Sequence, residues 1–162
     1  ILTDTVVAPI EGLQRTDLYN VDGGWVWLRQ YDNDDYEATT RTVCGPNGTN
    51  KTLDLDAIKA RYGADFHGYL WPVTAAGGEF YFSVSYQGPG RNWLYDLIDS
   101  TGNVVLAGLG SCNGYYAANP LPDGVFVARK GFEIGWMDLH GQWVYCQNIF
   151  YSSGDDAENY YF

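Results

Sequence analysis

Side chains that alternate in character with a period of two residues are the feature that most limits how this chain can fold. Residues 23–31, GGWVWLRQY, are the clearest case. Alternate positions of this stretch share one side of the expected strand: Trp25, Trp27, Arg29 and Tyr31. Similar strand signals occur at 79–86 and 125–130. Because successive side chains of a β-strand point to opposite faces, the pattern predicts a mainly β protein.

Composition supports short strands joined by tight turns. Aromatic residues make up 17% of the 162 residues and there are 20 glycines, a balance that suits strands and turns better than helices. The one predicted helix covers residues 54–63, DLDAIKARYG. Leu55, Ile58 and Tyr62 follow helical spacing there, aspartates stand at its start and Gly63 provides a stop.

One hairpin pattern occurs twice. IDSTGNVV at 98–105 and MDLHGQWV at 137–144 superpose without a gap at a displacement of 39 residues. In such a turn the Asp carboxylate caps backbone amides and the Gly takes a positive φ. We therefore expect hairpin repeats near 79–106 and 123–147, with a third, more diverged copy at the N-terminal side. A period near 40 residues predicts units that share a core by stacking.

The copy at 123–147 resembles the WG repeat, a bacterial module. Asp123-Gly124 matches the opening pair of that repeat, Gly135-Trp136-Met137-Asp138 matches its Gly-Tyr-Ile-Asp block, and Gly141 matches its turn glycine. The sequence departs from the repeat at Ile134, where the family has Trp, and the earlier copy lacks the Gly of the block. The resemblance implies an exported or surface-attached bacterial protein, and it brings no catalytic set.

These patterns predict antiparallel β-hairpin repeats in a single barrel-like or solenoid-like domain with one short helix. We place this domain at residues 1–152 and a polar tail at 153–162. The last six residues, AENYYF at 157–162, resemble the remnant of a protease-cleavable tag and are excluded from functional reasoning.

The charge balance limits the partners. Nine basic residues against 20 acidic ones give a formal net charge of -11, so nucleic acid and anionic lipid surfaces would be repelled. No apolar run approaches the length of a membrane-spanning helix, so we expect no membrane insertion. The sequence starts at Ile1 without a methionine, which fits either a mature exported protein or an artificially trimmed chain. We expect a secreted or cell-surface bacterial location.

Cysteine and histidine offer little for catalysis or for a cofactor. An odd number of cysteines, Cys44, Cys112 and Cys146, allows either one disulfide with a free thiol or three reduced thiols. His67 and His140 are the only histidines, and neither stands in a zinc-type spacing. We predict no cofactor.

The acidic stretch YDNDDYE at 31–37 allows two interpretations. Asp32, Asp34 and Asp35 bring several oxygens close together, as a Ca²⁺ site requires. The stretch lacks the Gly and the distant Glu of a calcium loop, which favours a solvated hairpin turn.

The aromatic side chains are the remaining functional signal. The residues expected to bind a ligand are Trp25, Trp27, Tyr31, Trp136 and Trp143. Such rings stack on sugars or anchor protein partners, whereas the structural alternative is that they fill a thin β core. The sequence therefore predicts a non-catalytic binding module for a glycan or a surface protein. A glycan hydrolase with an Asp/Glu pair, and a structural module that self-associates, are the alternatives.

Overall fold

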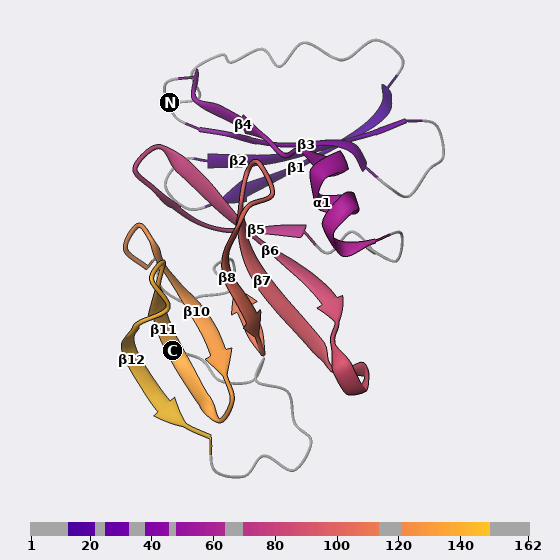
Figure 1. Ribbon diagram of the computed structural model, residues 1–162. Coiled ribbons are helices and arrows are strands. Elements are labelled where there is room, and N and C mark those ends of the chain that lie inside the picture. The colour runs from indigo at the N-terminus through magenta and orange to yellow at the C-terminus, as the bar shows by residue number, and fades with distance from the viewer. Residues whose placement is uncertain are drawn as a thin grey trace.

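The computed structural model describes residues 13–21, 25–32, 38–45, 48–63, 70–113 and 121–149, and it consists of three antiparallel sheets (Figure 1). Sheet A contains β1 (Leu13–Val21), β2 (Trp25–Asp32), β3 (Ala38–Cys44) and β4 (Asn50–Thr52). Sheet B contains β5 (Leu70–Ala76), β6 (Glu79–Gln87), β7 (Trp93–Asp99) and β8 (Val104–Leu109). Sheet C contains β9 (Ser111–Asn113), β10 (Val125–Lys130), β11 (Glu133–Asp138) and β12 (Trp143–Asn148).

Each sheet has the same topology. Its four strands lie in chain order, and every strand pairs antiparallel with the next one along the chain. The predicted mainly β, antiparallel character is therefore confirmed. The described strands form three separate open sheets, however, and neither a closed barrel nor a solenoid.

The predicted helix is confirmed with the expected ends. Helix α1 spans Leu55–Tyr62, and the Asp54 side chain caps it by accepting the Ala57 amide at 3.0 Å. Gly63 ends the helix with a φ of 82°, and its amide donates to the Lys59 carbonyl. Ile58 is the buried residue that joins the helix to the core.

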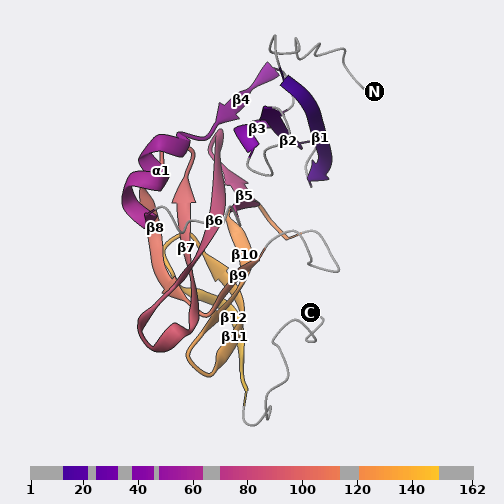
Figure 2. The same ribbon diagram turned by 90° about the vertical axis from the view of Figure 1, so that its right-hand side faces the viewer.

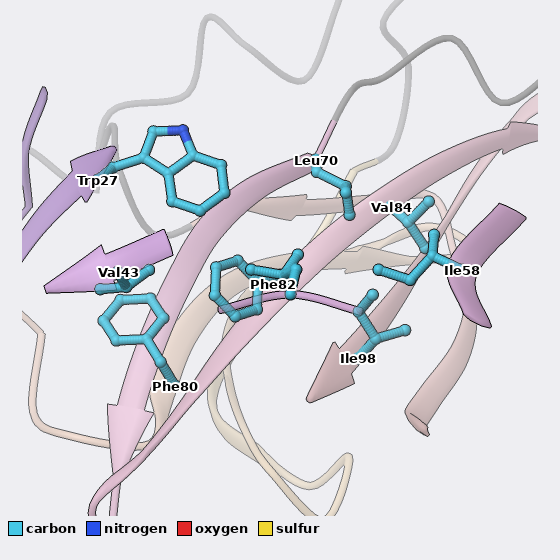
Figure 3. Packing of buried hydrophobic residues seen from close by; sticks show 9 residues of the cluster. Trp27, Val43, Ile58, Leu70, Phe80, Phe82, Val84 and Ile98 are labelled. Atoms are coloured by element: carbon cyan, nitrogen blue, oxygen red, sulfur yellow. The ribbon is translucent and has the colours of Figure 1, made fainter. Parts of the chain in front are cut away.

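Sheet B lies between the other two sheets (Figure 2). On one side, Phe80, Phe82 and Val84 of β6 pack with Trp27 and other residues of sheet A and with Ile58 of α1. Figure 3 shows Phe82 in the middle of this cluster.

A second apolar cluster joins sheet B to sheet C. Val73 and Leu97 of sheet B pack there with Phe126, Ala128 and Met137 of sheet C. Leu97 and Ile98 are successive residues of β7, so their side chains point to opposite faces of sheet B. Because Ile98 belongs to the first cluster and Leu97 to the second, β7 contributes to both clusters.

The two matched turns have the same geometry, as predicted. The Asp99 carboxylate accepts the backbone amides two and four residues later at 2.9 and 3.0 Å. The Asp138 carboxylate does the same at 2.8 and 2.9 Å. Gly102 and Gly141 take φ values of 85° and 77°, which side chains with a Cβ rarely adopt.

Gly135 occupies a position in β11 where a side chain does not fit. A Cβ there would overlap the Tyr145 carbonyl oxygen and stand 2.7 Å from the Cys146 Cα. We expect Gly135→Ala to lower the free energy of unfolding, measured by urea denaturation, by about 3 kcal/mol. Gly77→Ala is the control, because that glycine has a φ of 59° and no atom near its added Cβ, so about 1 kcal/mol is expected. Equal losses in the two variants would contradict this packing.

Asp99 also predicts a pH dependence of stability. Burial alone would raise its pKa, but hydrogen bonds from Thr101 and Asn103 outweigh burial and hold the pKa below its ordinary value of 3.8. A carboxylate with a lowered folded-state pKa stabilises the fold above its unfolded pKa, and this contribution is lost as the pH falls through the folded pKa. We expect Asp99→Asn to lower the melting temperature at neutral pH, with the difference from the wild type shrinking below about pH 4. Circular dichroism melts across this range provide the measurement, and a difference that stays constant with pH would disprove the assignment.

Candidate functional site

The aromatic residues predicted on sheet A lie in the interior. Trp27 is fully buried with its ring 5.5 Å from that of Phe82, and Tyr31 is only 7% exposed. Trp25 is half-buried and meets Phe80 edge-on at 5.1 Å. The face of β2 that carries these rings is turned towards sheet B, so we assign them to packing and do not propose them as ligand contacts.

The two aromatic residues predicted on sheet C point to opposite faces. Trp143 pairs with Met137 and packs on the cluster that joins sheets B and C, and its indole Nε1 donates to Glu133 Oε2 at 3.1 Å. Trp136 is half-buried on the other face, where its ring lies 5.6 Å from that of Tyr145. The five predicted binding residues therefore do not form one site.

The calcium candidates fall largely outside the structure. Asp34 and Asp35 lie outside the described residues, and Asp32 is placed only as the last residue of β2. His67 also lies outside them, whereas His140 is exposed in the β11–β12 turn. Within the described ranges, no group of three or more His, Cys, Asp or Glu side chains is placed to hold a metal ion.

All three cysteines are free thiols, which decides between the two arrangements that the sequence allowed. Burial raises the pKa of Cys44, and burial together with the nearby Asp96 charge raises that of Cys112. Since the thiolate is the reactive form, these two cysteines are held in the unreactive state. Cys112 packs in the cluster that joins sheets B and C.

Asp96 is the one carboxylate that is buried among the described residues, at 6% exposure. It accepts hydrogen bonds from the Tyr62 hydroxyl at 2.7 Å, the Tyr86 hydroxyl at 3.0 Å and the Gly108 amide at 2.8 Å. Burial and the hydrogen bond to Asp96 raise the pKa of both tyrosines. With three protein donors on its two oxygens, this carboxylate anchors α1 and β8 to the middle of sheet B.

An exposed indole stands at the hairpin between β6 and β7. Trp93 is 45% exposed, and it pairs across the hairpin with the exposed Gln87. The connection is a short 3₁₀ turn, Pro89–Arg91, followed by Asn92, and Arg91 and Asn92 are also exposed. In Figure 1 this hairpin projects at the lower right, away from sheets A and C.

The same hairpin contains an unusual backbone conformation. Arg91 has a φ of 64° and is the one residue other than glycine with a positive φ in the described part of the chain. Such a conformation costs about 1 kcal/mol or more and persists where the surroundings impose it. The Gly88 amide donates to the Asn92 carbonyl at 2.8 Å and closes the turn around Arg91. No local sequence pattern signals this strain at Arg91, and Trp93 was not among the residues predicted to bind a ligand.

The fold and its surface define a mainly β protein made of three stacked four-stranded sheets, with a tryptophan displayed on one hairpin. The chain belongs to the family described as "Domain of unknown function (DUF5046)", whose model matches residues 1–156. Neither a curated protein nor a solved structure shows a significant match to the chain.

None of the helices in the described part of the chain is both long enough and apolar enough to cross a bilayer.

The Asp96 anchor predicts a loss of stability when its charge is removed. We expect Asp96→Asn to lower the free energy of unfolding by about 2 kcal/mol, because a charged acceptor is lost and the new amide hydrogens face donors. Tyr86→Phe removes one of the three donors and should cost about 1 kcal/mol. Urea denaturation measures both changes. An Asp96→Asn variant as stable as the wild type would contradict the anchoring role.

Proposed function

We propose that this chain is a non-catalytic binding module that takes a glycan on the β6–β7 hairpin, with Trp93 as the stacking platform. The observation that carries the proposal is the exposed indole at the projecting end of a strained hairpin. Carbohydrate rings present apolar faces as well as hydroxyl groups, so they suit a flat aromatic ring with polar groups beside it.

The polar groups beside Trp93 fit this ligand class. Gln87 and Asn92 each offer an amide that both donates and accepts, and Arg91 offers several donors. Hydroxyl groups of a sugar need such mixed partners. The Gly88–Asn92 hydrogen bond holds the hairpin closed, so binding would order few additional backbone groups.

We also propose that the sheets are copies of a repeat related to the WG module, in an exported or surface-attached bacterial protein. Two observations support the repeat. The β7–β8 and β11–β12 turns use the same Asp–Gly geometry. The pair Phe82 and Ile98 in sheet B corresponds to the pair Phe126 and Met137 in sheet C. The bacterial, exported origin rests on the resemblance to the WG repeat.

The alternative function is that of a glycan hydrolase. The glycan-binding experiment below distinguishes hydrolysis from non-catalytic binding. Hydrolysis of a glycosidic bond needs two carboxyl groups on either side of the bond. Asp96, the buried carboxylate, is occupied by three protein donors. Release of reducing ends from a bound glycan would therefore favour a carboxylate pair elsewhere and would disprove the non-catalytic function.

The proposal predicts a binding defect confined to one hairpin. Cell-wall, mucin and plant glycans are titrated into the protein with and without Ca²⁺, and isothermal calorimetry reports binding even when the indole is removed. We expect saturable binding to one glycan class, its loss in Trp93→Ala, and an affinity about fivefold lower in Gln87→Ala because one hydrogen bond is lost.

Phe132→Ala is the matched control, since Phe132 is 79% exposed on a hairpin of sheet C. This variant should bind as the wild type does. No heat from any glycan, or equal binding by the Trp93→Ala variant, would refute glycan recognition at this hairpin. A surface protein, the other ligand class expected from the sequence, would then be the next one to test.

A further inference from the structure

Sheets B and C are equivalent strand by strand. Superposing the Asp99 turn on the Asp138 turn places β7 on β11, and the cross-strand pairing then places β6 on β10. In this superposition Ile98 corresponds to Met137 and Leu97 corresponds to Trp136. Both sheets present corresponding residues on the side of the preceding sheet, because Ile98 packs towards sheet A and Met137 packs towards sheet B.

The opposite faces of sheets B and C correspond as well. Leu97 lies on the face of sheet B that packs against sheet C. Its counterpart Trp136 lies on the face of sheet C directed away from sheet B, which we call the outward face of sheet C. This face therefore occupies the position that sheet B uses to hold the next sheet.

The composition of the outward face of sheet C suits such a contact. Its central residues on β10 to β12 are apolar or aromatic: Val125, Val127, Ile134, Trp136 and Tyr145. Ile134 is already buried within the chain, and Val125, Val127 and Trp136 are half-buried. Tyr145 is 43% exposed. Two charged residues lie at its margins. Arg129 donates from its guanidinium to the Gly110 carbonyl at 3.3 Å, with its Nε left without a partner, and Asp138 caps its turn.

The opposite end of the stack has a face with matching properties. On sheet A, the residues that alternate with Trp27 form the face directed away from sheet B, which we call the outward face of sheet A. Its described side chains carry no charge in a chain with a net charge of -11: Leu18, Val26, Leu28, Gln30, Thr40, Thr42, Cys44, Asn50 and Thr52. Leu28 and Gln30 are buried there, whereas Leu18 is 63% exposed.

We propose that the outward face of sheet C docks onto the outward face of sheet A of a second copy of the chain, and that two copies close a ring of six sheets. Within one chain, sheets A and B each pack one face against the next sheet along the chain. No described sheet covers the corresponding face of sheet C. Sheet A is the described sheet whose opposite side meets no preceding sheet. The second copy supplies the one face that continues the series.

A ring of six such sheets is a known architecture. Four-stranded up-and-down sheets repeated around an axis are the blades of β-propellers, which have about four to eight blades. Two chains of three sheets fall inside this range. A contact between two different faces forms a closed ring when the rotation from copy to copy brings the last free face back onto the first one. With two copies related by a twofold axis, both contacts between sheet C and sheet A are identical. Trp93 belongs to neither face, so this inference does not depend on the glycan site.

Light scattering coupled to size-exclusion chromatography tests the proposal on the whole chain. We expect a mass of twice the 18.1 kDa of one chain. Leu18→Asp and Tyr145→Asp should each give monomers, because a carboxylate would have to be desolvated in an apolar contact. Phe132→Asp adds the same charge at an exposed aromatic residue of the β10–β11 turn and should stay dimeric. Melting curves check that each variant is folded.

Mixing the two monomeric variants provides the sharper test. The Leu18→Asp chain keeps an intact face on sheet C and the Tyr145→Asp chain keeps an intact face on sheet A, so the mixture should regain a dimer through one unimpaired contact. A wild type that stays monomeric at every concentration would overturn the proposal. A dimer indifferent to Leu18→Asp would overturn it too, because it would join two copies of sheet C. Growth beyond the dimer would contradict closure by two copies.

Discussion

Sheet B carries apolar side chains on both of its faces, and the burial of both faces is the constraint on which the rest of the structure depends. Phe80 and Phe82 need cover on one side, whereas Val73 and Leu97 need it on the other. Each buried side chain of this size is worth about 2 kcal/mol relative to exposure, so a sheet with a single neighbour would lose several times that amount. Sheet B can therefore be stable only between two other layers, and sheets A and C supply them.

Polar groups strengthen this stack where the apolar contacts end. Arg29 of β2 reaches across to sheet B, with its guanidinium 5.6 Å from the centre of the Trp71 ring. Its partner Asp17 on β1 lies 3.5 Å away, directly across the strand pair. A cation that faces an aromatic ring and keeps a carboxylate partner retains much of its stabilisation when water is partly excluded. The contact between sheets A and B thus continues beyond Phe80 and Phe82 through Arg29, whose charge is paired with that of Asp17.

Local features were predictable from the sequence, because the residues that specify them are neighbours in the chain. The caps of α1 at Asp54 and Gly63 and the Asp turns at Asp99 and Asp138 depend on contacts across a few residues. The arrangement of three open sheets was not predictable, since alternation along a strand does not say which sheet covers which face. The prediction of a barrel-like or solenoid-like domain went further than that pattern allowed.

The assignment of binding residues met the same limit. Trp25 and Trp27 pack into the core because sheet B covers their face of β2. The residues near them in the sequence do not indicate that another sheet lies there. Trp93 lies at the end of its hairpin and keeps 45% of its surface exposed. The positive φ of Arg91 could not be predicted from the sequence either, because arginine rarely adopts this conformation. A glycine or asparagine at that position would have been recognised as a turn signal.

The distribution of charge connects the stack to its surroundings. A net charge of -11 would oppose any contact between two copies if the acidic residues were spread evenly. The described side chains on the outward face of sheet A are uncharged, and the acidic residue at the margin of the outward face of sheet C, Asp138, is held by its own turn. At physiological ionic strength, charges farther apart than about 8 Å are largely screened from one another. Among the described side chains of the two end faces there is therefore no carboxylate that would oppose the proposed contact between copies, and the acidic residues elsewhere on the surface maintain solubility.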